Sequence, residues 1–419
     1  MLRYRLMIAF IFGIFFLLID WYFYQAVKVV SENWTPGGRQ IFRIAFWIPS
    51  ILSLAAMLWW TFDDPFRHSA QVRNWIITAL MATYFSKLLG VVVLLIGDLG
   101  RMVQYIISAW KPSSAPPPTG EVALMPRSEF LGKAALIGAG LPMGAFVFGI
   151  VSGAHDYRLR KQKIIVKNLP KSLHGLTVGQ LSDIHSGSFW NKTAVKGGVE
   201  LMMSQKPELI MFTGDLVNNE TTEYRGYSEI FSKLSAPLGV YSVTGNHDYG
   251  DYRSWTSKSE KKKNFDDLVT AHHETGFDLL MNQNRKIKIG DSELFVAGVE
   301  NWGAGRFAKY GKLEEAMIGH DQADFRILLS HDPSHWDAEV RKKFSGLELM
   351  LSGHTHGFQF GVEYGGFKWS PSQYLYKQWA GLYQEGKQNL YVNRGFGYLG
   401  YPGRVGIPPE VTVLELVRA

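Results

Sequence analysis

Aspartate, histidine and asparagine gather at five points in the second half of the chain, each directly after a short apolar run. The first two points are Asp183-Ile184-His185 after LTVGQLS and Gly214-Asp215 after ELIMFT. The others are Gly245-Asn246-His247-Asp248 after GVYSVT, His331 after FRILLS, and His354-Thr355-His356 after LELMLS. Carboxylate, imidazole and amide oxygen are ligands that zinc, manganese and iron accept. The candidate metal ligands are Asp183, His185, Asp215, Asn246, His331, His354 and His356.

This ligand set is larger than one ion uses, which favours two ions that share a bridging group. Two cations about 3.5–4 Å apart can hold both the attacking and the leaving oxygen of a phosphoryl group. A hydroxide that bridges the metals needs no nucleophile from the protein. The sequence has no cysteine and no Ser–His–Asp arrangement to supply one. The clusters therefore predict a metal-dependent hydrolase of phosphoester or phosphoric anhydride bonds.

The elements that must position these clusters belong to an α/β fold. The short, nearly continuous apolar runs are typical of strands buried in a layered sheet. Helical connectors such as 193–205 and 264–276 lie between several of them. Ligand sites in such sheets form outside the carboxyl ends of the strands. We therefore expect all five clusters to meet at strand ends, with Gly214 and Gly353 permitting tight turns beside the ligands.

The order of these motifs resembles that of a known family. The ordered set D-x-H, G-D, G-N-H-D, a lone His and G-H-T-H resembles the calcineurin-like metallophosphoesterases over roughly 170–419. The hydrophobic N-terminus and the ending YVNRGFGYLGYPGRVGIPPEVTVLEL make it similar to the bacterial membrane-associated branch, which includes phosphodiesterases and UDP-2,3-diacylglucosamine hydrolases. The front end also resembles the animal transmembrane protein with metallophosphoesterase domain. The resemblance implies a four-layer sandwich of mixed β-sheets flanked by helices. Phe358 departs from the second glycine of many relatives, which affects the shape of the pocket.

The resemblance also implies how the ligands divide between two divalent ions of manganese, zinc or iron type. One ion would be held by Asp183, His185, Asp215 and His356. The other would be held by Asp215, Asn246, His331 and His354, with Asp215 as the bridge. His247 would lie beside the phosphate and stabilise charge or protonate the leaving oxygen. His247 and Asn246 are therefore the expected catalytic residues.

Other residues are weaker candidates. Asp248 could orient His247 as a carboxylate behind it, or it could cap a turn. Arg394 and Arg404 could contact phosphate, because guanidinium forks suit that group, although salt bridges are their commoner use. His335 could also reach the site.

Residues 1–155 form a different region. Four apolar stretches approach or exceed the ~20 residues that span a bilayer as a helix. They lie at about 6–27, 44–62, 75–96 and 130–151, with a Pro/Ser-rich linker at 111–126. We expect an all-α transmembrane region followed by the metallophosphoesterase domain at 156–419. Asp20 and Lys87 interrupt two spans. They are functional, or each lies near a membrane interface, or they pair structurally.

Charge and composition bound the partners. The net charge of +7 lies mostly around the apolar spans, so nucleic acid is not an expected partner. The expected partners are the lipid bilayer and a lipid-linked phosphate substrate, and the sequence leaves the oligomeric state open. We expect a multi-pass protein of the bacterial inner membrane. The flanking cations divide almost evenly, with a slight excess that favours a cytoplasmic catalytic domain.

The expected activity is hydrolysis of a phosphodiester or pyrophosphate bond by a metal-bridging hydroxide. A tethered nucleotide phosphodiesterase or phosphatase is the alternative enzyme. A membrane sensor that uses the same domain without turnover is the non-catalytic alternative, and the complete ligand set argues against it.

The aromatic segment 364–383 could wall the cleft, hold an acyl chain, stack a base or rest at the membrane interface. The basic segment 158–171 could hold the domain against anionic headgroups.

Overall fold

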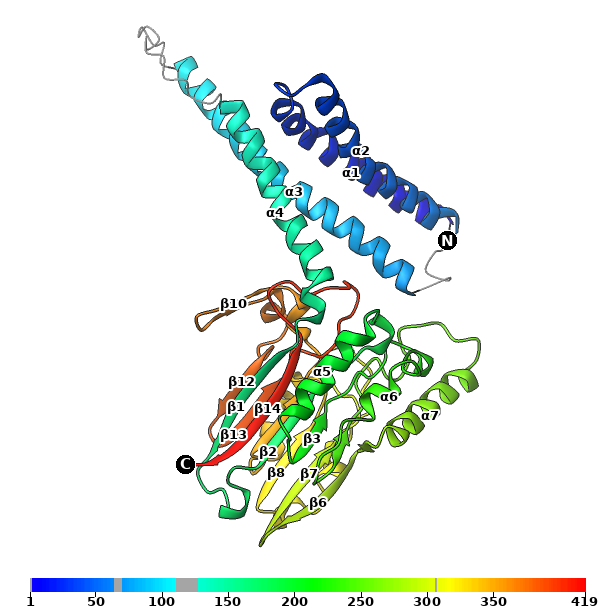
Figure 1. Cartoon of the computed structure of the whole chain (residues 1–419), viewed down its shortest axis with the longest axis vertical. Helices are drawn as coiled ribbons and strands as arrows, with labels where there is room; N and C mark the ends of the chain where they lie inside the picture. The colour runs from blue at the N-terminus through cyan, green and yellow to red at the C-terminus, as the bar shows by residue number, and fades with distance from the viewer. Residues whose placement is uncertain (1, 64–69, 111–126, 306) are drawn as a thin grey trace. The chain divides into compact units, whose positions relative to one another are not determined.

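A computed structural model describes residues 2–63, 70–110, 127–305 and 307–419 (Figure 1). The chain divides into two compact units, Met1–Phe148 and Gly149–Ala419. The division falls inside the fourth helix, slightly before the boundary near residue 155 that composition suggests. The last turn of that helix therefore belongs to the second unit.

The first unit consists of long apolar helices. They are α1 (Leu2–Val30), α2 (Pro36–Phe62), α3 (Ala70–Trp110) and α4 (Arg127–Val151). Within the described residues, four helices are long and apolar enough to cross a membrane. Each contains one of the stretches expected from the sequence, and α3 extends well beyond its stretch to 41 residues. The Pro/Ser-rich linker at 111–126 lies outside the described residues.

The two charges that interrupt the spans form a buried ion pair. Lys87 Nζ on α3 lies 2.5 Å from Asp20 Oδ1 on α1 and 3.0 Å from Ser50 Oγ on α2. The Tyr84 hydroxyl donates to the other carboxylate oxygen at 3.1 Å. Lys87 Nζ also lies 4.4 Å from the centre of the Phe46 ring. The pair therefore joins three helices, and each charge has partners that replace water.

The second unit contains two six-stranded mixed sheets. The first has the order β1 (Arg158–Val166), β14 (Glu410–Arg418), β2 (Thr177–Leu181), β3 (Leu209–Phe212), β4 (Val240–Ser242) and β5 (Asp278–Leu279). The second has the order β12 (Gly381–Glu385), β13 (Gln388–Val392), β9 (Leu349–Ser352), β8 (Phe325–Leu329), β7 (Ser292–Gly298) and β6 (Gln283–Ile289). The strands β2 to β5 run parallel, as do β13, β9, β8 and β7.

Side chains on β3 show how the layers form. Leu209 and Met211 enter the apolar core between the sheets, which also contains Ile327 and Leu351 from the second sheet. Ile210 and Phe212 point the opposite way, as the period of two requires, into the core under the helices. The helices α5 (Lys192–Ser204) and α7 (Lys258–Glu274) cover this outer face. A third core lies on the outer face of the second sheet. These layers confirm the expected sandwich of mixed sheets flanked by helices.

Shorter elements complete the second unit. A two-stranded hairpin consists of β10 (Val362–Tyr364) and β11 (Phe367–Trp369). Short α-helices are α6 (Ser228–Phe231), α8 (Leu313–Ala316) and α9 (Arg341–Lys343). Tighter or wider single turns occupy Gly153–His155, Lys171–Leu173, Ser186–Ser188, Thr221–Glu223, His320–Gln322, Trp336–Val340, His356–Gln359 and Pro371–Tyr374.

Removing one partner of the buried ion pair should destabilise the helical unit. In Asp20→Leu the ammonium of Lys87 loses its countercharge, so we expect unfolding to become easier by about 3–5 kcal/mol. Combining Asp20→Leu with Lys87→Met should restore most of this loss, because no charge is left buried. The melting temperature of the full chain in detergent measures both changes.

Lys133→Ala is the matched control, because it breaks the more exposed ion pair of Lys133 with Glu129. This variant should change the free energy of unfolding by less than ~1 kcal/mol. A double variant as unstable as Asp20→Leu alone would contradict the structural role of the pair.

Candidate metal centre

Six of the seven expected ligands form two groups at the carboxyl ends of the central strands. Asp183, His185 and His356 form one, and Asp215, His331 and His354 form the other, with ligand atoms within 4.8 Å of one another in each group. Asp215 Oδ2 lies 3.4 Å from His185 Nε2 and 3.1 Å from His331 Nε2. Asp215 therefore lies between the two groups. The sheets also meet here, because Asp215 follows β3 of the first and His331 follows β8 of the second.

Unpartnered polar atoms support a cation at this place. His185 Nε2, His356 Nε2 and Asn246 Oδ1 are buried and have no hydrogen-bond partner among the described residues. A buried acceptor without a partner destabilises the fold, and a divalent cation is a partner for an imidazole nitrogen and an amide oxygen. The donor set of two carboxylates, four imidazoles and an amide therefore fits divalent metal.

The backbone of the ligand loops is strained. Five of the expected ligands have the left-handed backbone conformation that side chains other than glycine rarely adopt: Asp183 (φ 51°), His185 (47°), Asp215 (60°), His354 (71°) and His356 (50°). Such residues persist where the surrounding structure holds them, and they cluster at functional sites. The ligand loops are therefore shaped for the side chains they present rather than for backbone stability.

Carbonyl groups orient three of the imidazole rings. His331 Nδ1 donates to the Thr213 carbonyl at 2.7 Å, and His247 Nδ1 donates to the Asn218 carbonyl at 2.8 Å. The side-chain oxygen of Asn218 lies 3.1 Å from His185 Nδ1. Because a carbonyl oxygen only accepts, Nδ1 of these rings carries a proton, and Nε2 is the nitrogen that faces a metal or a substrate.

His354 has the reverse arrangement. Its Nε2 lies 2.7 Å from the Tyr376 hydroxyl, while its Nδ1 faces His331 Nε2 at 3.2 Å. Nδ1 is therefore the nitrogen that this ring presents to the second group. Tyr376 is the member of the expected aromatic segment 364–383 that reaches the centre directly.

Asp248 supports the ligand loops through their backbone. Its carboxylate accepts from the N–H groups of Asp215 (3.0 Å), Leu216 (2.8 Å), Val217 (3.3 Å) and Gly245 (2.8 Å). This is the turn-capping alternative, and the Asn218 carbonyl takes the orienting role at His247. The expectation that Asp248 orients the His247 ring is therefore replaced by a role in holding the loop of Asp215.

Both arginines proposed for phosphate contact are engaged inside the protein. Arg394 donates to Glu410 and to Glu363, at 2.6 Å each. Arg404 is buried and donates from Nη2 to the carbonyls of Arg394 (2.8 Å) and Gly395 (3.1 Å). Neither guanidinium has the free fork that the expected phosphate contact needs, so this expectation is corrected to an ion-pair role and a loop-bracing role.

His335 does not belong to either ligand group. Its Nδ1 lies 2.9 Å from Ser330 Oγ, and its ring stacks on Trp302 with 4.3 Å between centroids. It is a buried packing residue behind the strand end.

Neighbouring charges set the ionisation of the centre. Burial by itself raises the pKa of a carboxyl, but His356 holds the pKa of Asp183 below its usual range and His331 does the same for Asp215. Burial lowers the pKa of His185 to about 3. Burial also disfavours charge on His331, yet Asp215 raises its pKa to about 10. A metal that binds His331 Nε2 must therefore displace a proton.

A cavity of about 430 Å³ adjoins the second group. It is lined by Asn246, Asp251, Tyr252, Asn301, Phe307, Ala308 and Tyr310. Asn246 Nδ2 donates to the Tyr252 hydroxyl at 2.8 Å, and the Phe307 ring lies 5.0 Å from that of His354. Sequence reasoning missed these aromatic residues, because single aromatics in separate loops carry no spacing signal.

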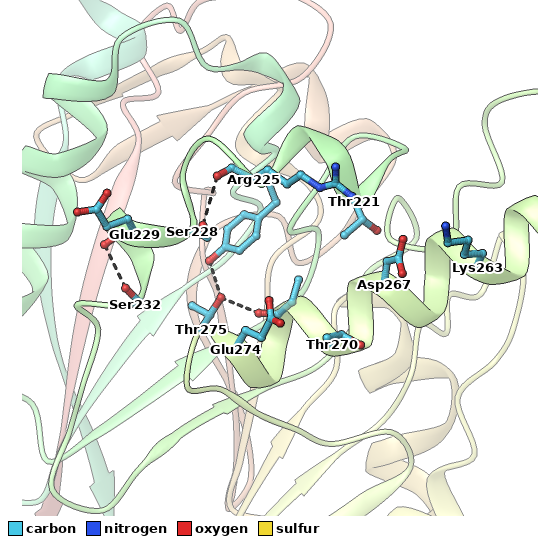
Figure 2. A pocket seen from close by; sticks show the side chains of 12 residues that line it. Thr221, Arg225, Ser228, Glu229, Ser232, Lys263, Asp267, Thr270, Glu274 and Thr275 are labelled. Atoms are coloured by element: carbon cyan, nitrogen blue, oxygen red, sulfur yellow. Dashed lines mark hydrogen bonds between the residues drawn. The ribbon is translucent and has the colours of Figure 1, made fainter.

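A second cleft is separate from the metal centre. Figure 2 shows it between the segment 221–232 and α7, with side chains of both signs that include Arg225, Glu229 and Asp267. None of the described residues that line it is an expected metal ligand. The candidate site therefore remains at the strand ends.

Comparisons with known proteins agree with this geometry. Residues 176–358 match the family model "Calcineurin-like phosphoesterase", and residues 4–154 match "Probable Calcineurin-like phosphoesterase, transmembrane domain". The chain is 30% identical to the metallophosphoesterase YkuE of Bacillus subtilis over 299 residues, which covers 70% of this chain and 98% of YkuE.

Two further relatives carry informative names. The chain is 29% identical to the transmembrane protein with metallophosphoesterase domain of Danio rerio over 283 residues, covering 65% of this chain and 60% of that protein. It is 29% identical to the phosphodiesterase YaeI of Escherichia coli over 241 residues, covering 57% of this chain and 80% of YaeI. The chain thus spans less than two thirds of the length of the Danio rerio relative.

Glu223 holds the loop that carries Asn218, and through it the rings of His185 and His247. Its Oε2 accepts from the N–H groups of Asn218 (2.6 Å) and Asn219 (3.3 Å). Burial raises the pKa of Glu223 to about 7, although these two donors lower it.

Glu223 should therefore make stability depend on pH. The pKa of Glu223 in the folded protein lies above its ordinary value of 4.5. The protonated carboxyl therefore contributes stability that is fully present below pH 4.5 and is lost as the pH rises through about 7. We expect Glu223→Gln to remove this pH-dependent loss of stability. The loss amounts to up to about 3 kcal/mol in the free energy of unfolding between pH 5 and pH 8. Melting temperatures across this range, with a chelator present, measure it.

Glu229→Gln is the control, because Glu229 is exposed on the neighbouring helix α6. Its pH profile should match that of the unmodified protein. If Glu223→Gln showed that same profile too, the buried carboxyl would not be the source of the pH dependence.

Proposed function

This chain belongs to the calcineurin-like phosphoesterase family, and we propose that it is a two-metal hydrolase of a phosphodiester or pyrophosphate bond in a lipid-linked substrate. It is a membrane-anchored metallophosphoesterase, since the family model and, within the described part of the chain, four apolar helices lie on one polypeptide. The two-metal part of the proposal is supported above all by the position of Asp215 between two ligand groups.

We assign the ligands as two sets that share Asp215. The first set is Asp183, His185 and His356, and the second is Asn246, His331 and His354. The unpartnered Asn246 Oδ1 and the reversed His354 ring support the second set. Bound divalent ions of manganese, zinc or iron type would supply Lewis acidity and activate water at neutral pH.

His247 is suited to move the proton of the reaction. Its backbone N–H donates to Asp215 Oδ1 at 2.9 Å, which holds it beside both groups. Since its Nδ1 proton is bonded to the Asn218 carbonyl, Nε2 is the atom that can exchange a proton with substrate, and it gives one when both ring nitrogens carry protons. As water oxygen bonds to phosphorus and the bond to the leaving oxygen breaks, the doubly protonated His247 ring gives its Nε2 proton to that leaving oxygen. The attacking water loses a proton to solvent, which restores the proton on Nε2.

The substrate class rests on the surroundings of the site. Tyr252, Phe307 and Tyr310 give the cavity beside Asn246 aromatic walls for the part of the substrate beyond the phosphate. Such rings accept an acyl chain or stack on a base. The four apolar helices favour a lipid-linked substrate, and the aromatic cavity is the observation that favours the second candidate, a tethered nucleotide phosphodiesterase.

Hydrolysis of bis-p-nitrophenyl phosphate by the full chain in detergent tests the metal chemistry. Chelation should abolish turnover, and manganese or zinc should restore it. His247→Ala should lower kcat by about 10²–10⁴-fold while bound metal stays unchanged, because it removes a proton donor and no ligand. Asn246→Ala should lower bound metal, measured by elemental analysis.

His273→Ala is the matched control, because His273 is exposed on α7. It should retain full turnover and metal content. Bound metal without turnover on bis-p-nitrophenyl phosphate or on any lipid or nucleotide substrate would contradict the enzyme and favour the sensor alternative.

Paired substrates with the same scissile bond test the lipid part of the proposal. We expect kcat/KM to be at least about tenfold higher for an acylated pyrophosphate or phosphodiester in mixed micelles than for its water-soluble headgroup, because remote binding energy assists the reaction. Equal values would favour the tethered nucleotide phosphodiesterase.

We further propose that the protein lies in the bacterial inner membrane with the catalytic unit in the cytoplasm. The slight excess of cations on that side and the bacterial relatives support this. The chain has no cysteine, so Ile318→Cys introduces one thiol at an exposed position. A membrane-impermeant maleimide should label it only after the cells are permeabilised, and labelling of intact cells would reverse the orientation.

A further inference from the structure

Exposed apolar side chains concentrate in one segment of the second unit. Among the described residues beyond 155, six of the ten exposed large hydrophobic residues lie within 358–375. They are Phe358, Val362, Tyr364, Phe367, Tyr374 and Leu375. Tyr364 is 85% exposed and Tyr374 is 74% exposed. Such clustering within one segment favours an interaction surface, whereas single exposed apolar residues are ordinary.

The hairpin in this segment turns its apolar face away from the domain. Directly opposed residues share a face, so the pairs Val362–Trp369 and Tyr364–Phe367 lie together on one side. Glu363 and Lys368 lie on the other side. Glu363 accepts from Arg394 at 2.6 Å, and Lys368 Nζ donates to the Ala380 carbonyl at 2.6 Å. The charged face is therefore bonded to the protein, which leaves the apolar face outward. In Figure 1 the strand labelled β10 extends away from the sheets.

The segment 358–375 is flanked on both sides by residues of the metal centre. His356 precedes it, and Tyr376, bonded to His354, follows it. At its base the Ser370 hydroxyl donates to the Gly357 carbonyl at 2.7 Å. The hairpin is thus continuous with the wall of the site.

The same segment is bonded to the end of a membrane span. Val405 N–H donates to the Gln359 carbonyl at 2.8 Å, and Gly361 N–H donates to the Val405 carbonyl at 2.9 Å. The adjacent Arg404 N–H donates to the carbonyl of Gly149, in the last turn of α4, at 3.1 Å. The fourth candidate span ends at His155. The outward apolar face therefore lies two short connections from the point where the chain leaves the membrane.

We propose that the apolar face of the β10–β11 hairpin docks into the headgroup interface of the bilayer that α4 crosses. Tyrosine and tryptophan favour this interface, because each has an apolar body and a polar tip. The continuity with α4 selects the bilayer over a soluble partner. Docking needs no catalysis, and it would also hold the wall of the metal site at the headgroup layer.

Fluorescence quenching in the full chain tests the docking. Because the chain has no cysteine, Tyr364→Cys and Phe367→Cys each introduce one site for an environment-sensitive fluorophore. The protein is placed, one chain per disc, in nanodiscs of phosphatidylethanolamine and phosphatidylglycerol. Ile318→Cys is the control, because Ile318 is 70% exposed beside β6, at the opposite edge of its sheet from β12.

We expect nitroxide-labelled lipid to quench the fluorophore at 364 and 367 at least threefold more than at 318. Aqueous iodide should quench the fluorophore at 364 and 367 at least threefold less than the fluorophore at 318. Equal iodide quenching at all three positions would overturn the proposal. Protection that appears only when two chains share a disc would also overturn it, because a second copy would then cover the face.

A kinetic test separates this surface from the proposed activity on which the test rests. The double variant Tyr364→Ser with Phe367→Ser should lower turnover of a lipid-linked substrate in bilayers by about tenfold. Turnover of bis-p-nitrophenyl phosphate should stay within about twofold, since neither residue contacts the metal centre. Normal lipid turnover in the double variant would remove the link between docking and substrate access. Quenching without any turnover would leave the docking standing and contradict only the proposed function.

Discussion

The carboxylate of Asp215 is the constraint on which the catalytic unit depends. It lies at the end of β3, is almost wholly buried, and faces imidazoles from both sheets within 3.4 Å. A buried carboxylate is tolerated only when charge and hydrogen bonds compensate its lost hydration. The two sheets supply that compensation together, so the packing of one sheet on the other also places the ligands of the site. A cation shared between the groups would complete it.

The loops that carry the ligands have strained backbone and need support from other side chains. Left-handed backbone occurs at most of the ligand positions, and loops of this kind hold only because other groups brace them. Asp248 collects the N–H groups of the Asp215 loop, and Glu223 holds the Asn218 loop that orients two rings. Arg404 spans the carbonyls of the loop beside His356. Buried polar side chains thus replace regular secondary structure as the source of rigidity at the centre.

The two units solve the problem of buried charge in similar ways. In the helical unit, Asp20 and Lys87 neutralise each other and recruit Ser50 and Tyr84 from neighbouring helices. In the catalytic unit, Arg394 is enclosed between Glu363 and Glu410. This second pairing has a consequence for the surface, because Glu363 fixes the charged face of the hairpin inward. The apolar face outside is the result of a buried ion pair inside.

The sequence by itself determined the four spans, the layered α/β fold and the five clusters at strand ends. These features are local, since a strand period, a tight loop and a run of apolar residues are each written within a few adjacent positions. Only the tertiary structure decided which distant partners meet. The sequence left open whether Asp20 and Lys87 are functional charges or pair with each other, and only the tertiary structure brings them together. Asp248 follows His247 in sequence, yet its carboxylate binds the backbone of a loop about thirty residues earlier. The arginines 394 and 404 looked free for phosphate because their partners come from other segments, and Tyr376 and Tyr252 reach the ligands from loops with no motif. Side-chain partners depend on how strands are ordered in the sheets, and that order is a property of the whole chain.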